Sequence, residues 1–253
     1  MKILLSPAKS LDWENSYPEV KTSVPQLLDN ANYLASKLEK LSVRQVKKLM
    51  DLSDNLAQLN VDRFQELQKY NNTRPALFAF DGDVYKGLDA TNLSPEALDR
   101  AESQIRILSG LYGILRPFDN IMPYRLEMGT SLKITPAKTN LYKYWNDTVV
   151  NTLKAELDDP NELIVNAASI EYAKVIVGVK NHGLNILNVE FKEKKGDNFK
   201  VVSFFAKKAR GLFAKFCLEA SPKDKESLKD FNFEGYQFNS ELSTDNNYTY
   251  TRE

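Results

Sequence analysis

Three short apolar segments that end in the same way place the strongest constraint on the fold. They are LLSPAK at residues 4–9, ILSGLYG at residues 107–113 and VNAAS at residues 165–169. Each passes from apolar residues typical of a buried strand to small or hydroxyl residues. Segments with helical spacing of apolar residues lie between them. We therefore predict an α/β fold, with a twisted mixed sheet and surrounding helices in a single domain of residues 1–253.

Local signals predict the remaining elements. A proline or hydroxyl residue precedes most of the helical patterns, and Ser42 with Gln45 resembles a capping box. The predicted helices begin at or near residues 25, 43, 53, 60, 95, 141, 169, 209 and 221. The predicted strands cover residues 2–5, 76–80, 105–108, 163–166, 189–193, 200–205, 231–238 and 248–251, of which 189–193 and 200–205 form a hairpin.

Residues 105–129 combine a tight backbone, fixed turns and positive charge more densely than any other stretch. Glycines follow the apolar run, and two prolines fix the turns between Arg116 and Arg125. Glycine lets backbone N–H groups approach a ligand closely. We interpret this stretch as the floor of the functional site. Its candidate pocket residues are Ser109, Gly110, Gly113 and Tyr124.

The ends of the three apolar segments predict a cleft. Ligands of α/β sheets bind outside the carboxyl ends of the strands, so three parallel neighbours would bring these ends together. Cations and backbone donors there suit a phosphate group. The alternative is that each segment ends in an ordinary turn. The residues predicted to line the cleft are Ser6, Lys9, Ser109, Gly110, Arg116, Arg125, Ser169 and Lys174.

A second basic feature is the cluster Lys207, Lys208, Arg210 and Lys215. Residues 191–215 hold eight lysines and arginines against two acidic residues, although the whole chain has a formal net charge of zero. Such segregation is typical of surfaces that bind phosphate backbones. The alternative is a solvated helix face.

Acidic residues in the predicted pocket indicate a second kind of chemistry. Asp81 and Asp83 flank Gly82, and Glu171 follows the third apolar segment. Carboxylates so placed serve in acid–base catalysis or bind a metal ion. A turn explains Asp81 and Asp83 equally well.

Composition excludes several classes of protein. The single cysteine, Cys217, rules out an internal disulfide and thiolate metal clusters, and the single histidine, His182, rules out a multi-histidine metal site. We expect His182 to lie in a surface turn at residues 181–183. No Walker loop or dinucleotide fingerprint occurs, so we predict no metal and no cofactor. No apolar run is long enough to span a membrane, and we expect a cytoplasmic protein without a membrane partner.

The chain resembles the YaaA family of bacterial proteins along nearly its whole length. The resemblance is carried by ILLSPAKSLD at residues 3–12, FDGDVYKGLDA at 80–90, RILSGLYGILRPFDNIMPYRLEMG at 106–129, LYKYW at 141–145 and VVSFFAKKARGLFAKF at 201–216. It implies a role in resistance to peroxide stress that keeps unincorporated iron low and so limits iron-driven DNA damage. It also implies DNA binding, a basic cleft in a fold specific to the family, and an element like a helix-hairpin-helix. Residues 56–60 are a candidate for that element, although they lack its usual glycines.

Two functions from different classes follow. The first is a DNA-binding stress protein that contacts phosphates through the cluster at residues 207–215 and through Lys9, Arg116 and Arg125, without strong sequence preference. The second is an enzyme acting on a nucleotide, a nucleobase or a nucleic-acid end. An open basic groove favours the first, and convergent polar groups around a pocket favour the second. A third class is a protein-interaction module acting on iron metabolism.

Overall fold

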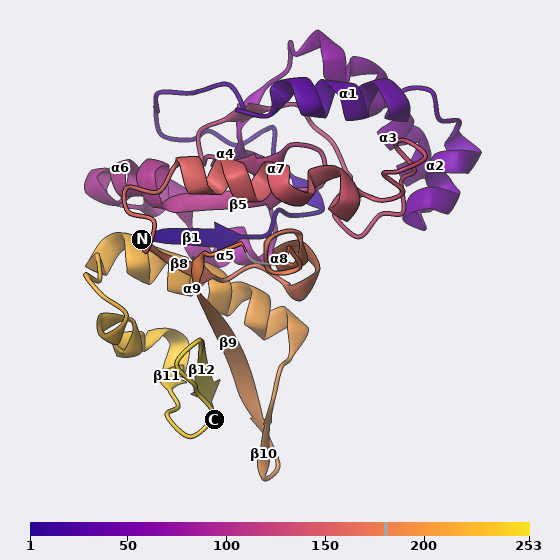
Figure 1. Cartoon of the computed structure of the whole chain (residues 1–253). Coiled ribbons are helices and arrows are strands. Elements are labelled where there is room, and N and C mark those ends of the chain that lie inside the picture. The colour runs from indigo at the N-terminus through magenta and orange to yellow at the C-terminus, as the bar shows by residue number, and fades with distance from the viewer. Residues whose placement is uncertain (180–181) are drawn as a thin grey trace.

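The computed structural model describes residues 1–179 and 182–253, and its centre is one mixed sheet. The strands of the sheet are β1 (Lys2–Leu5), β5 (Ile105–Ser109), β6 (Gly113–Leu115), β8 (Leu163–Asn166), β9 (Asn185–Lys195), β10 (Asn198–Lys200), β11 (Gln237–Phe238) and β12 (Asn247–Arg252). Their order is β11-β12-β9-β8-β1-β5-β6, with β10 paired to β9 (Figure 1). The predicted mixed α/β fold is confirmed.

The centre of the sheet is parallel and fully enclosed. Strand β1 lies between β5 and β8 and runs parallel to both, with Ile3 opposite Ile105 on one side and Val165 on the other. Every residue of β1 and β5 is buried, so both faces of the sheet are covered. The predicted cleft required the three apolar segments to be parallel neighbours, and this condition is met. Their carboxyl ends therefore meet at one edge.

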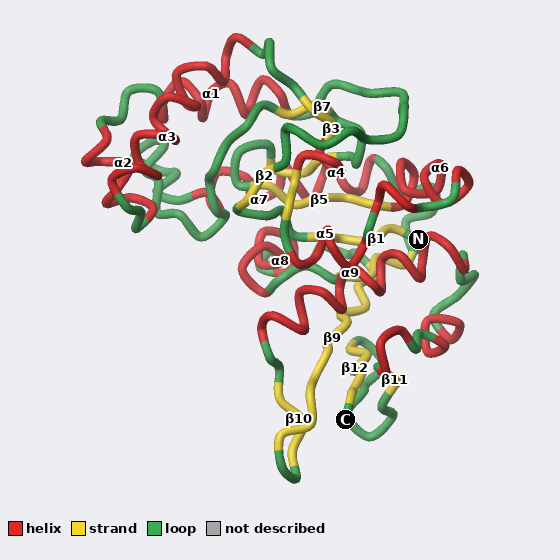
Figure 2. The backbone as a smooth tube through the Cα atoms, turned by 180° about the vertical axis from the view of Figure 1, so that it is seen from behind, coloured by secondary structure: helices red, strands yellow, loops and turns green. Residues whose placement is uncertain are grey.

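Helices surround this centre. They are α1 (Leu28–Leu38), α2 (Val43–Met50), α3 (Asp54–Glu66), α4 (Ala76–Ala79), α5 (Asp83–Leu88), α6 (Pro95–Gln104), α7 (Leu141–Ala155), α8 (Ile170–Val177) and α9 (Ser203–Ala220). Helix α6 contacts β1 and β5, α8 contacts β5, and α7 contacts β6. Figure 2 shows α1, α2 and α3 grouped at one end of the molecule, while β9 and β10 extend from the other.

Several starts of helices follow the predicted signals. The side chains of Ser42, Ser94 and Ser169 cap α2, α6 and α8, and Ser42 completes a capping box with Gln45. Such caps satisfy backbone N–H groups that have no partner within the helix. Helix α1 begins later than predicted, at Leu28, because the carbonyl of Pro25 accepts the N–H of Leu28 in a preceding turn.

The two short helices predicted after Ser53 and Asn60 are one helix, and this prediction was wrong. Asn60 lies inside α3, where its side-chain amide donates to the carbonyl of Leu56 at 2.7 Å instead of capping a new helix. Residues 56–60 are therefore continuous helix and contain no hairpin. The candidate position for a helix-hairpin-helix element is excluded.

Three predicted strands are wrong over most of their length. Residues 76–80 form the single helical turn α4 before the two-residue strand β4 (Phe80–Asp81), because an apolar run buried on all sides carries no periodicity. Of residues 200–205, only the first lies in β10; α9 begins at Ser203, so the hairpin partner of β9 is short. Residues 231–238 hold the 3-10 turn Phe233–Gly235 and, only at their end, the two-residue strand β11, since Phe231 and Phe233 pack as aromatic anchors. Residue Ser221 ends α9 in a left-handed conformation, and the short helix that follows is the 3-10 turn Glu226–Asp230.

Small strand pairs and an aromatic core complete the fold. Strand β2 (Ser10–Leu11) pairs with β4, and β3 (Arg74–Pro75) pairs with β7 (Asn120–Ile121). The rings of Phe191, Phe213, Phe231 and Tyr250 are fully buried together, with centroids 5.2–5.9 Å apart. Contacts of this kind exceed the value of simple area burial. They fix α9 against β9 and β12, and hence the position of its polar side chains.

No helix within residues 1–179 or 182–253 is long and apolar enough to cross a membrane. The predicted turn at residues 181–183 lies partly outside the described residues; at its described end, the Nδ1 atom of His182 accepts the N–H of Leu184 at 3.0 Å.

Candidate functional site

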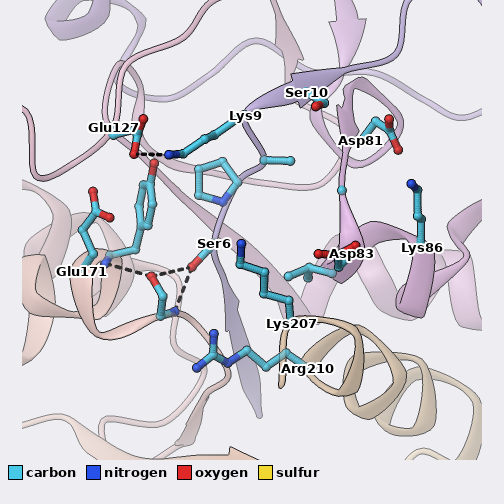
Figure 3. Close-up of a pocket in the computed structure, with 16 residues that line it drawn as sticks. Ser6, Lys9, Ser10, Asp81, Asp83, Lys86, Glu127, Glu171, Lys207 and Arg210 are labelled. Carbon is cyan, nitrogen blue, oxygen red and sulfur yellow. Dashed lines mark hydrogen bonds and ion pairs between the residues drawn. The ribbon is translucent and has the colours of Figure 1, made fainter. Parts of the chain in front are cut away.

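A cleft of about 490 Å³ opens at the carboxyl ends of β1 and β8 (Figure 3). Four segments supply most of its lining: the loop after β1, residues 81–86 at the start of α5, the first turn of α8, and two side chains of α9. Glu127 from the loop before α7 completes it. The cleft is therefore built where the fold places ligands in α/β proteins. We call it the strand-end cleft.

Ser6 and Ser169 join the two strand ends. The backbone N–H of Ser169 donates to Oγ of Ser6 at 2.8 Å, and the Ser6 hydroxyl donates to Oγ of Ser169 at 3.3 Å. The same Ser169 oxygen caps α8 by accepting the N–H of Tyr172. These bonds hold the positive end of the α8 dipole at the cleft. The two serines are predicted site residues, and the structure brings them together.

Four cations line the strand-end cleft, and three of them have no ionic partner. Nζ of Lys9 lies 3.0 Å from a carboxylate oxygen of Glu127. Across the described ranges, no carboxylate lies within 4.0 Å of Lys86, Lys207 or Arg210. The Nε–H of Arg210 is buried without a hydrogen-bond partner, and this burial lowers the pKa of its guanidinium. An unpartnered buried donor is costly, so an anionic ligand at Arg210 would remove a penalty.

The acidic side chains of the cleft differ in how they are held. One carboxylate oxygen of Glu171 accepts the N–H of Gly129 at 2.8 Å, which ties the loop after residue 123 to α8. Asp81 and Asp83 are half-buried, and their carboxylates accept no hydrogen bond from any described residue. Counting Glu127, the cleft has as many carboxylates as cations. It is thus a site of mixed charge rather than a purely basic surface.

Two glycines fix the distance between the acidic and basic walls. A Cβ atom built on Gly211 of α9 would lie 1.8 Å from the carbonyl oxygen of Val84, and one on Gly87 of α5 would lie 2.2 Å from that of Lys208. Helices α5 and α9 therefore touch backbone to backbone. This contact sets Asp83 and Lys86 relative to Lys207 and Arg210.

Apart from Glu127, residues 105–129 pack behind the cleft instead of lining it. The hydroxyls of Ser109 and Tyr124 share a buried hydrogen bond of 2.6 Å, and burial raises the pKa of Tyr124. The carbonyl of Gly110 accepts Nε1–H of Trp145 at 2.9 Å. Gly113 has φ of +73° and packs on the Trp145 ring, which explains why glycine occurs there. The structure does not bring these four predicted residues to the surface of the cleft.

The arginines of this stretch have separate positions. Arg116 donates to the carboxylate of Asp119 through Nε and Nη2, at 3.1 and 2.8 Å, and borders a different cleft beside α6. Arg125 lies close to the strand-end cleft, with Nη2 3.4 Å from Glu127. Lys174 stacks on Tyr142, 5.1 Å from the ring centre, and is not part of the lining.

The basic cluster at residues 207–215 is divided. Lys207 and Arg210 line the strand-end cleft. Lys208 pairs with Glu234 at 2.5 Å, and Lys215 pairs with Asp89 at 3.0 Å. One helix therefore presents two cations to the cleft and holds two in ion pairs elsewhere.

Sequence reasoning missed Lys86, Glu127 and Tyr172. Lys86 was detectable, because it lies one helical turn after Asp83 and therefore shares its face of α5. Glu127 follows Arg125 by two residues in the stretch already singled out. The described residues hold no group of three or more histidines, cysteines, aspartates or glutamates arranged to bind a metal ion.

Comparison with known proteins matches this chain to one family over nearly its whole length. The family described as "Peroxide stress protein YaaA" matches residues 1–242. A UPF0246 protein of Idiomarina loihiensis is 47% identical over 256 residues, covering 100% of this chain and 98% of the relative. A UPF0246 protein of Flavobacterium psychrophilum is 45% identical over 255 residues, covering 100% of both chains. The chain therefore belongs to the peroxide stress protein YaaA family.

Proposed function

We propose that this protein is a cytoplasmic DNA-binding protein of the peroxide stress response that holds phosphates of the DNA backbone at the strand-end cleft and so limits iron-driven DNA damage. One observation carries the proposal: Lys86, Lys207 and Arg210 converge on the cleft without an ionic partner in the described chain, beside the positive end of the α8 dipole. Phosphate is the anion that such a combination of cations and helix terminus fits.

The division of the basic cluster sets the expected strength of the salt dependence. Lys208 and Lys215 are already neutralised by Glu234 and Asp89, so they release few counterions from DNA. With two or three phosphates contacted, the plot of log K against log salt should have a slope of about −2 to −3 for duplex DNA. A much steeper slope would indicate a long basic surface instead of the cleft.

Fluorescence anisotropy with labelled duplex and single-stranded DNA over a salt series tests the proposal. Lys207→Gln should weaken binding and reduce the slope by about 0.9 for duplex DNA, because one fewer phosphate is neutralised. Lys208→Gln, on the next residue of α9 but paired outside the cleft, is the matched control and should change little. No binding by the wild-type protein at low salt would refute the proposal.

Protection of DNA is tested separately. Supercoiled plasmid treated with ferrous iron and hydrogen peroxide should be nicked more slowly when the protein is bound. Lys207→Gln should protect less at equal concentration. Equal nicking with and without bound protein would refute a protective role at the DNA.

A second function is favoured by a specific feature of the same cleft. Asp81 and Asp83 stand beside the cations with their carboxylates unoccupied by any described donor. Carboxylates within reach of a bound phosphate ester are the groups that transfer protons in enzymes acting on nucleotides, nucleobases or nucleic-acid ends. Chromatography of nucleotides and short oligonucleotides incubated with the protein tests this function, with Asp83→Asn as the inactive comparison.

A further inference from the structure

The charges of the strand-end cleft indicate a ligand that carries both an anionic group and hydrogen-bond donors. Glu127 pairs with Lys9 at 3.0 Å and, outside the lining, with Arg125 at 3.4 Å, so neither Lys9 nor Glu127 is left for a ligand. Three cations, Lys86, Lys207 and Arg210, and three carboxylates, Asp81, Asp83 and Glu171, remain. A lone phosphate would satisfy the cations and be repelled by the carboxylates. The complementary ligand therefore carries hydrogen-bond donors as well as an anion.

The three carboxylates differ in how many hydrogen bonds they already accept. This difference indicates which of them bind the hydrogen-bond donors of the ligand. Glu171 already uses one oxygen to accept the N–H of Gly129. Asp81 and Asp83 accept nothing from the described chain and are only half-buried, so both keep all their acceptor sites for a ligand. In Figure 3, Asp81 and Asp83 lie on one side of the cleft, Glu171 lies on the other, and Lys207 stands between them.

The opposite end of the ligand is located by α9. Arg210 has a buried Nε–H without a partner, and Lys207 lies on the preceding turn of the same helix. The contact of Gly211 with α5 holds these cations beside the aspartates. The cleft measures about 490 Å³, which is within the size of small-molecule sites.

We propose that the strand-end cleft binds one nucleotide whose base carries an amino group, with its phosphate on Lys207 and Arg210 and its amino group on Asp81 and Asp83. Guanine, adenine and cytosine present such an amino donor on the Watson–Crick edge, and carboxylates accept hydrogen bonds from it. Uracil and hypoxanthine lack the amino group. This inference rests on the proposed function in one respect, that the anion bound by the cleft is a nucleic-acid phosphate.

Isothermal titration calorimetry of the full chain with two matched pairs of nucleotides tests the inference. GMP and IMP differ only by the amino group, and CMP and UMP differ by an amino group against a carbonyl. GMP should bind about tenfold more tightly than IMP, and CMP more tightly than UMP, as expected for a lost base contact. Equal affinity within both pairs would overturn the inference.

Variants assign the effect to the aspartates. Asp83→Asn should reduce the preference for GMP over IMP, measured as the ratio of their dissociation constants, to less than about threefold. Lys207→Gln should weaken the binding of both nucleotides by the same factor and leave this ratio unchanged. Asp89→Asn is the control, because Asp89 pairs with Lys215 outside the cleft. If Asp83→Asn does not fold, the wild-type comparison of the two pairs still decides the matter.

Inorganic phosphate and ribose 5-phosphate separate this inference from the function on which it rests. Binding of phosphate, nucleotides and DNA without discrimination between the bases would leave the phosphate site standing and overturn base recognition. Failure of all these probes to bind would overturn both. Tight binding of GMP and CMP with weak binding of IMP, UMP and ribose 5-phosphate supports the inference.

Discussion

Replacing Gly211 by alanine tests whether the contact between α5 and α9 is as close as the structure shows. The new methyl group would lie 1.8 Å from the carbonyl oxygen of Val84 and 2.6 Å from the nitrogen of Leu88. Both are backbone atoms of α5, so no side-chain rotation relieves the clash. The helices would have to separate by roughly 1.2 Å to restore even a tight contact of 3.0 Å.

The change in stability on Gly211→Ala is the balance of two opposing effects, helix propensity and overpacking. In a helix free of this contact, Gly→Ala stabilises the protein by about 1 kcal/mol through helix propensity. Overpacking against backbone costs about 1–3 kcal/mol, occasionally more. With three backbone contacts below 3.0 Å, we place the overpacking cost at about 3 kcal/mol, so we expect a net loss of about 2 kcal/mol and a fall in Tm of about 4–8 °C.

Urea unfolding followed by circular dichroism measures the loss. Gly87→Ala pushes the same two helices apart, so the double variant should lose less stability than the sum of the single variants. A Tm for Gly211→Ala equal to or above that of the wild-type protein would refute the reasoning. The single variant should also bind DNA more weakly, because the walls of the strand-end cleft move with the helices.

Three further predictions concern other parts of the chain. Ser42→Ala should lower the free energy of unfolding in urea by about 1 kcal/mol, because the capping box of α2 is lost. The backbone N–H of Ser94, and then its hydroxyl, lower the pKa of Glu219 below its ordinary 4.5, so the ionised carboxylate stabilises the fold above that pH. The difference in free energy of unfolding between the wild-type protein and Glu219→Gln should therefore shrink as the pH falls below 4.5, and a difference that stays constant with pH would contradict this. Burial raises the pKa of the Cys217 thiol, so a colorimetric disulfide reagent should label it only after unfolding, and rapid labelling of the native protein would show that the thiol is accessible.

The parts of the site that could be predicted follow from one rule about sheets. Ser6 and Ser169 are separated by 163 positions in the chain, yet their hydrogen bond follows once β1 and β8 are read as parallel neighbours. Parallel strands present their carboxyl ends at the same edge, so the pattern of apolar residues was enough. Lys9, which lies just past the first strand, reaches the cleft for the same reason.

The parts that could not be predicted depend on pairings between distant segments. The helical pattern of residues 207–215 places Lys208 and Lys215 away from the core, but nothing local shows that Glu234 and Asp89 neutralise them. The sequence predicted that Arg116 lines the cleft, because it lies in the same stretch as Arg125. Its pairing with Asp119, three residues later, holds it beside α6 instead.

The glycines and prolines of residues 105–129 invited an interpretation as a ligand-binding loop, and the structure gives them a different physical reason. Gly110 meets the carbonyl of Leu126, and Gly113 meets the ring of Trp145, at distances that admit no side chain. A chain that must turn sharply inside a core needs such residues as much as a chain that approaches a ligand. A buried turn and a ligand-binding loop differ in whether their polar groups already have hydrogen-bond partners within the protein. Around Ser109 and Tyr124 the hydroxyls pair with each other, whereas the buried Nε–H of Arg210 at the cleft has no partner in the described chain. Unsatisfied groups that converge on a cleft indicate a ligand more strongly than tight turns do, because a buried polar group without a partner persists at a cost in stability.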